Sequence, residues 1–162
     1  MASHDAPMEN LHDLLTAPAA TTPDKPAVLE LGADGHLNAV SYRELTALAG
    51  CYAAALGELG LGIGDRVLIR SVTSAPAVAL ILACSALGLL FVPVSPQAPA
   101  GRLRMIIDAA EPALVAQARP APPETPAREP LRDARGEPLP EAVFDGYGLT
   151  ANRLPTRRSG RS

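Results

Sequence analysis

The most constraining feature of this sequence is the alternation of helix-like and strand-like segments between Ser41 and Ala116. Helical spacing of apolar residues predicts helices over 41–59, 74–88 and 99–110, and short apolar runs predict strands at 66–70, 89–94 and 113–116. Strands that alternate with helices pair in parallel, and the helices cover the resulting sheet. The sequence therefore predicts an α/β fold with a helix-covered, mostly parallel sheet.

The first of these helices has recognisable signals at both ends. Ser41 and Glu44 have the spacing of a capping box, in which each side chain binds the backbone N–H of the other residue. Apolar residues then recur every three or four positions as far as Leu59, and Gly60 is suited to end a helix. We expect one apolar stripe of this helix to face the sheet.

Two further elements are predicted before Ser41. Leucines at helical spacing between Leu11 and Leu15 indicate a short helix that ends before Thr21. The runs 26–31 and 37–40 flank a Gly-Ala-Asp-Gly turn, which predicts an antiparallel β-hairpin.

The uncharged run from Ala75 to Val94 raises the question of a membrane span, because its length is about that of a transmembrane helix. However, Pro76, Gly88 and Pro93 interrupt the run, and its last residues resemble a strand. A buried helix followed by a buried strand fits this pattern better. We therefore expect no membrane partner.

The periodic pattern ends near Gln117, so we divide the chain into a folded domain over 10–117 and a segment over 118–162. The second segment is rich in proline and arginine and is expected to be an irregular linker or disordered tail. It contains a small apolar group between Val143 and Leu149. This group could either dock onto the domain or belong to the disordered segment.

Charge and cysteine content exclude several functions and compartments. The net charge of −3 provides no field that would attract nucleic acid. Cys51 and Cys84 lie in predicted apolar helices, where buried thiols need no oxidising compartment. The N-terminus lacks the basic and apolar pattern of an export signal. A cytoplasmic location follows as the expectation.

No residue pattern predicts a catalytic, cofactor-binding or metal-binding site. The glycines at 60, 62 and 64 resemble a phosphate loop in composition, but they follow a helix and precede a strand, which is the reverse of the phosphate-loop order. An ordinary turn after a helix explains them better. Arg102, Arg104 and Asp108 are expected to form the solvated face of the 99–110 helix.

Several motifs, taken in order over residues 10–117, resemble one enzyme family. They are Leu11-His-Asp-Leu-Leu, Thr22-Pro-Asp-Lys-Pro-Ala, Val40-Ser-Tyr-Arg-Glu-Leu, Leu59-Gly-Leu-Gly-Ile-Gly-Asp-Arg-Val and Ala86-Leu-Gly-Leu-Leu-Phe-Val-Pro-Val-Ser-Pro. The set resembles the opening motifs of adenylate-forming (AMP-binding) ligases, which include acyl-CoA ligases and the adenylation domains of nonribosomal peptide synthetases. The predicted fold would then be the N-terminal part of such a ligase.

The resemblance implies an enzyme that uses ATP and Mg²⁺ to convert a carboxylic or amino acid into an acyl adenylate. In relatives, the Thr-Ser-Gly-Thr-Thr-Gly phosphate loop and the catalytic lysine lie downstream of the matched motifs, and the loop does not occur in this sequence. We therefore expect a truncated or split ligase that is inactive alone and binds no cofactor by itself. Its expected partner is a complementary ligase fragment. The alternative is a non-catalytic module that pairs with an intact ligase or a carrier protein.

Overall fold

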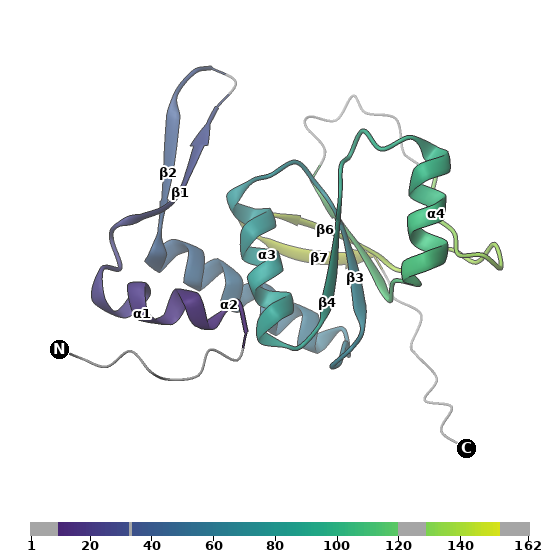
Figure 1. Cartoon of the computed structure of the whole chain (residues 1–162), viewed down its shortest axis with the longest axis horizontal. Coiled ribbons are helices and arrows are strands. Elements are labelled where there is room, and N and C mark those ends of the chain that lie inside the picture. Colours follow the sequence, from purple (N-terminus) through teal and green to yellow (C-terminus); the bar gives the residue numbers. More distant parts are fainter. Residues whose placement is uncertain (1–9, 33, 120–128, 153–162) are drawn as a thin grey trace.

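A computed structural model describes residues 10–32, 34–119 and 129–152 of the chain (Figure 1). The helices in this part are α1 (Asp13–Thr21), α2 (Tyr42–Glu58), α3 (Ala75–Ala86) and α4 (Ala100–Ala110). The strands are β1 (Pro26–Leu31), β2 (Leu37–Ser41), β3 (Arg66–Arg70), β4 (Leu90–Val94), β5 (Leu114–Ala118), β6 (Glu141–Asp145) and β7 (Gly148–Asn152).

The strands form two separate sheets. The larger sheet has the order β4-β3-β5-β6-β7, in which the first four strands are parallel and β7 is antiparallel to β6. The smaller sheet is the antiparallel hairpin of β1 and β2. The predicted α/β class, the mostly parallel sheet and the N-terminal hairpin are therefore confirmed.

Helices cover both faces of the larger sheet, and α3 and α4 lie on opposite sides of it (Figure 1). Val67, Ile69 and Leu114 point to the face that packs with α2 and α3. Leu68 and Val115, which alternate with them along the strands, pack with α4 on the other face. Because both faces are buried, these strands are apolar throughout rather than alternating.

The predicted signals of α2 are present in the structure. Ser41 accepts the backbone N–H of Glu44 at 3.3 Å, and the Glu44 carboxylate accepts the Ser41 N–H at 2.8 Å, which completes the capping box. The buried residues of the helix recur every three or four positions: Leu45, Ala49, Tyr52 and Leu56. Gly60, with a φ of 74°, adopts the left-handed conformation after the helix end.

The apolar run from Ala75 to Val94 is divided between two elements. It forms α3 and β4, separated by a turn in which Gly88 has a φ of 68°. Among the described residues, no helix combines the length and apolar character that a membrane span requires.

The prediction that 118–162 is an irregular tail is wrong for part of the segment. β6 pairs in parallel with β5, and β7 pairs with β6, so these strands extend the sheet beyond residue 117. The buried residues Ala142 and Phe144 alternate along β6 and complete the core next to β5. Pairing with β5 thus orders a segment whose proline-rich and arginine-rich flanks predict disorder. Residues 120–128 and 153–162 lie outside the described residues.

The expectation that both cysteines are buried is correct for only one of them. Cys84 on α3 is buried, but Cys51 on α2 is exposed. Cys51 precedes Tyr52, which lies on the apolar stripe of α2, so the helical rotation places Cys51 outside that stripe.

Candidate functional site

The carboxyl ends of the parallel strands are where ligands bind in open α/β sheets, at positions where the strand order reverses. In this chain β4 lies on one side of β3 and β5 lies on the other. The loop after β3 leads to α3 and the loop after β4 leads to α4, on opposite faces of the sheet (Figure 1). The end of β3, at Arg70, is therefore the expected position of a ligand-binding site.

The polar groups at this edge contact other parts of the chain. The Arg70 guanidinium donates to the carbonyl oxygen of Pro96 at 3.0 Å, which links the end of β3 to the loop after β4. On β5, Gln117 donates to Glu141 at 3.0 Å, and the second oxygen of Glu141 accepts the Leu131 N–H at 2.9 Å. These bonds fix the loops and strands relative to one another.

The N-terminus of α3 faces the same edge, but its backbone N–H groups are capped by side chains. Ser74 accepts the N–H of Ala77 at 3.3 Å, and the Glu30 carboxylate accepts the N–H of Ala75. A helix N-terminus attracts anions through its free N–H groups and its dipole. Here the N–H groups of Ala75 and Ala77 already have side-chain acceptors.

Glu30 is a contact that sequence reasoning missed. It lies on β1, 45 positions before Ala75 in the sequence, and no local pattern pairs the two residues. Its only signal is a charged residue within an otherwise apolar strand. Such a residue needs a polar partner when it is partly buried.

The glycines at 60, 62 and 64 form a turn between α2 and β3, as the order of elements predicts. Gly62 donates to the Asp65 carboxylate at 2.9 Å, and Gly64 donates to the Gly88 carbonyl oxygen at 2.9 Å. This turn precedes β3 and therefore lies at the end of the sheet opposite Arg70. Its position and its internal hydrogen bonds do not suit phosphate binding.

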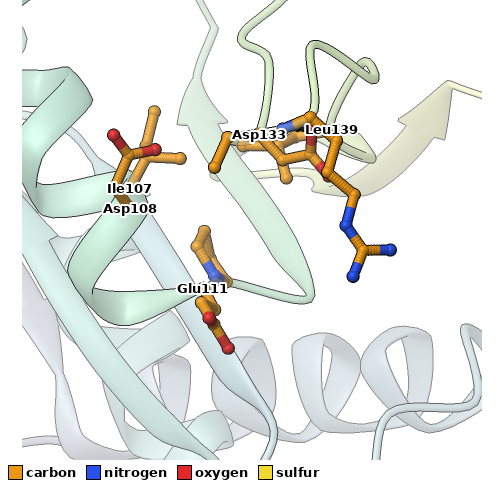
Figure 2. Close-up of a pocket in the computed structure, with 8 residues that line it drawn as sticks. Ile107, Asp108, Glu111, Asp133 and Leu139 are labelled. Atoms are coloured by element: carbon orange, nitrogen blue, oxygen red, sulfur yellow. Dashed lines mark hydrogen bonds between the residues drawn. The ribbon is translucent and has the colours of Figure 1, made fainter.

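A hollow of about 300 Å³ lies at the other end of the sheet, where α4 ends and β5 begins (Figure 2). It is lined by Ile107, Asp108, Glu111, Pro112, Asp133, Ala134, Arg135 and Leu139. Asp108 forms an exposed ion pair of 3.1 Å with Arg104, and Asp133 accepts the Arg135 and Glu137 N–H groups of its own turn. The carboxylates of Asp108 and Asp133 thus have structural partners. The expected solvated face of α4 is present, since Arg102, Arg104 and Asp108 are all exposed.

The buried Cys84 thiol, the Tyr52 phenol and the metal-binding side chains give no alternative site in the described part of the chain. Burial raises the pKa of the Cys84 thiol to about 12, so this cysteine stays protonated at neutral pH. Burial likewise raises the pKa of the Tyr52 phenol, whose hydroxyl donates to the Asp145 carbonyl oxygen. Within residues 10–32, 34–119 and 129–152, no three His, Cys, Asp or Glu side chains are grouped as metal ligands.

The turn between β6 and β7 is stabilised by the Asp145 carboxylate. Oδ1 accepts the N–H groups of Tyr147 at 2.8 Å and Gly148 at 3.1 Å, while Oδ2 lies 2.5 Å from Nε of Arg119. The Tyr147 N–H, followed by the Arg119 guanidinium, holds the pKa of Asp145 below its ordinary value, although partial burial opposes this shift. The charged carboxylate therefore stabilises the folded turn.

This lowered pKa predicts a pH dependence that Asp145→Asn removes, since asparagine keeps an acceptor oxygen but loses the charge. The contribution of the charge is complete above an unfolded-state pKa of about 3.9 and is lost as the pH falls through the lower folded-state value. We expect the wild-type chain to exceed the variant in free energy of unfolding near neutral pH, and the difference to shrink toward pH ~2. Urea unfolding at several pH values measures it. A difference independent of pH would contradict the prediction.

Comparison with known proteins identifies the family. A family model described as "AMP-binding enzyme" matches residues 15–153. The chain belongs to the AMP-binding enzyme family. The matched region includes β6 and β7, so the family resemblance also extends past residue 117.

Relatives among known AMP-binding proteins are much longer than this chain. The L-proline–[L-prolyl-carrier protein] ligase of Pseudomonas fluorescens is 32% identical over 108 residues, which cover 67% of this chain and 21% of the ligase. Malformin synthetase mlfA of Aspergillus neoniger is 37% identical over 103 residues, which cover 64% of this chain and 2% of the synthetase. The chain therefore spans a minor part of each relative.

Solved structures show the same relationship. The structure of IdnL1 matches 97% of this chain and 30% of its own chain, with 47% identity and a TM-score of 0.77. The fatty acid AMP ligase from Legionella pneumophila matches 68% of this chain and 20% of its own, with 25% identity and a TM-score of 0.62. The fold described above is thus a portion of a larger adenylate-forming fold.

Enzymes of the AMP-binding family use ATP and Mg²⁺. The described residues of this chain do not fit either group. The N–H groups at the start of α3 bind Glu30 and Ser74, the glycine-rich turn lies at the opposite end of the sheet, and no carboxylate cluster suits a cation in the described ranges. We therefore assign no step of a reaction to these residues.

Proposed function

We propose that the chain supplies the N-terminal scaffold of an adenylate-forming ligase, which uses ATP to activate a carboxylic or amino acid as an acyl adenylate. The observation that supports this most directly is the match of 97% of this chain to 30% of IdnL1. The nucleotide-binding and acid-binding residues would then belong to the remainder of the ligase.

In this role the residues at the carboxyl edge of the sheet act by positioning. Arg70 fixes the loop after β4 through Pro96, and Glu30 fixes the start of α3. The loop after β4 and the start of α3 would then present a rigid surface to the part of the ligase that binds substrates. Sites supported by rigid elements hold reacting groups more accurately than sites on free loops.

The proposal predicts that the purified chain catalyses no acid-dependent exchange between ATP and pyrophosphate. A chimaera gives the positive test: this chain replaces the corresponding part of the P. fluorescens proline ligase. We expect the chimaera to catalyse exchange with L-proline, because the remainder of the ligase would supply the proline site. The intact ligase is the positive control.

Two results would contradict this proposal. Exchange by the isolated chain would show that it contains a complete site. A soluble chimaera without exchange would show that the chain does not act as a ligase scaffold, and would favour the alternative of a module that binds an intact ligase or a carrier protein. We also propose a cytoplasmic location, with which the free thiols of Cys51 and Cys84 are consistent.

A further inference from the structure

The β1–β2 hairpin has an apolar face that the described part of the chain leaves exposed. The register pairs Leu29 with Ala39 and Leu31 with Leu37, so these four side chains lie on one face. The exposed fractions are 60% for Leu29, 75% for Leu31 and 63% for Leu37. We call these four residues the outer hairpin face.

The opposite face of the hairpin is already in use. Val28 and Val40 pair in the register and pack against the main core, and Glu30 caps α3. A hairpin with one solvated face normally alternates apolar inward residues with polar outward residues. This hairpin has its charged residue inside and three leucines outside, which is the composition of strands buried on both faces.

Local hydrogen bonds fix the orientation of the outer hairpin face. Gly35, with a φ of 80°, turns the chain and donates to the Gly32 carbonyl oxygen at 2.9 Å. The Tyr42 N–H donates to the Lys25 carbonyl oxygen at 3.1 Å at the other end of the hairpin. A shift of one residue would exchange the two faces, and these bonds at both ends oppose such a shift.

No other strand within the described residues pairs with the edges of the hairpin. The hairpin is a two-stranded sheet separate from the five-stranded one, and it projects from the helices beside it (Figure 1). An open strand edge readily pairs with another strand. The open edges and the exposed leucines both indicate a surface that is completed by further polypeptide.

We propose that the outer hairpin face is the docking surface for the remainder of an adenylate-forming ligase. This inference rests on the proposed function. Its occupant follows from chain length: IdnL1 matches nearly all of this chain, yet 70% of IdnL1 lies outside the match. The outer face contains no charged side chain, so the surface that covers it should be apolar.

The experiment compares Leu31→Lys in the isolated chain and in the proline-ligase chimaera. Leu31 is 75% exposed in this chain, so the substitution should leave its thermal midpoint unchanged. In the chimaera, docking would bury the lysine, and we expect the midpoint to fall by several degrees. Met105→Lys on α4 is the matched control, because Met105 is 73% exposed and lies outside the hairpin. It should have no effect in either protein.

A second measurement tests the same proposal if the chimaera fails to fold. The tagged chain and the remainder of the proline ligase are co-expressed as two polypeptides and recovered on the tag. Burial of a leucine side chain stabilises a complex between two polypeptides. Leu31→Lys should therefore reduce recovery of the second polypeptide about tenfold or more. Met105→Lys should not reduce it.

The possible results separate the docking proposal from the proposed function. Equal effects of Leu31→Lys in the chain and the chimaera, or none in both, would overturn docking at the hairpin. Where the chimaera does not fold, docking at the hairpin would also be overturned if the unmodified chain recovered none of the second polypeptide. A dimer of the isolated chain that Leu31→Lys dissociates would assign the face to a second copy. Exchange activity of the chimaera with L-proline tests the ligase scaffold independently of these results.

Discussion

Replacing Phe144 by alanine is expected to lower the free energy of unfolding by about 3–5 kcal/mol. Phe144 is 1% exposed, and its ring packs edge-on against Tyr52, with the centroids 6.2 Å apart and the planes at 80°. Folded domains of this size have about 5–15 kcal/mol of stability in total. The variant should therefore unfold at a much lower urea concentration, as followed by circular dichroism.

The matched control for this prediction lies three residues away. Tyr147 is an aromatic residue in the turn of the same hairpin, but it is 99% exposed. Tyr147→Ala should change the free energy of unfolding by no more than about 0.5 kcal/mol. If both variants matched the unmodified chain, β6 would not be part of the cooperative core. The Phe144 result thus tests directly whether the segment after residue 117 belongs to the domain.

The part of the fold that could be predicted from sequence is the part with strong local signals. The capping box at Ser41 and Glu44 marks the start of α2, and glycines mark the ends of α2 and α3. The hairpin of β1 and β2 has a glycine-containing turn between two apolar runs. Each of these signals acts over a few residues, so it is visible without knowledge of the tertiary structure.

β6 and β7 could not be predicted with the same methods. Only two side chains of β6, Ala142 and Phe144, are fully buried, so the apolar pattern is too short to distinguish from a disordered segment. The order of β6 depends on its pairing with β5 and on the contact of Phe144 with Tyr52 on α2. These partners are distant in sequence, and composition alone favours disorder.

The candidate site shows the same division between local and distant signals. The order of helix and strand around the glycines predicts a turn after a helix, and the structure has this turn between α2 and β3. The caps at the start of α3 come from two sources: Ser74 directly precedes the helix, but Glu30 comes from another sheet. The outer hairpin face also required the register, because only the pairing shows that Leu29, Leu31 and Leu37 share one face.

Helix α3 makes the second strong prediction, because apolar residues are buried around most of its circumference. Its buried residues are Ala75, Ala77, Ala79, Leu80, Leu82, Ala83 and Cys84. The alanines contribute little area each, so the few larger side chains account for much of the apolar surface that the helix removes from water. Leu80 is 0% exposed and belongs to the main core.

Leu80→Ala is therefore expected to lower the free energy of unfolding by about 2–5 kcal/mol, through lost burial and the cavity left behind. Leu90→Ala makes the same chemical change on β4, where the side chain is 56% exposed, and should lower it by less than about 1 kcal/mol. Urea denaturation of both variants measures the difference. Equal losses would mean that α3 is not packed against α2 and the sheet, since an enclosed leucine and a half-exposed one would then be equivalent. A large loss at Leu80 alone would show that the apolar run from Ala75 to Val94 is buried in a protein core. Its division into a buried helix, α3, and a strand, β4, requires such a core.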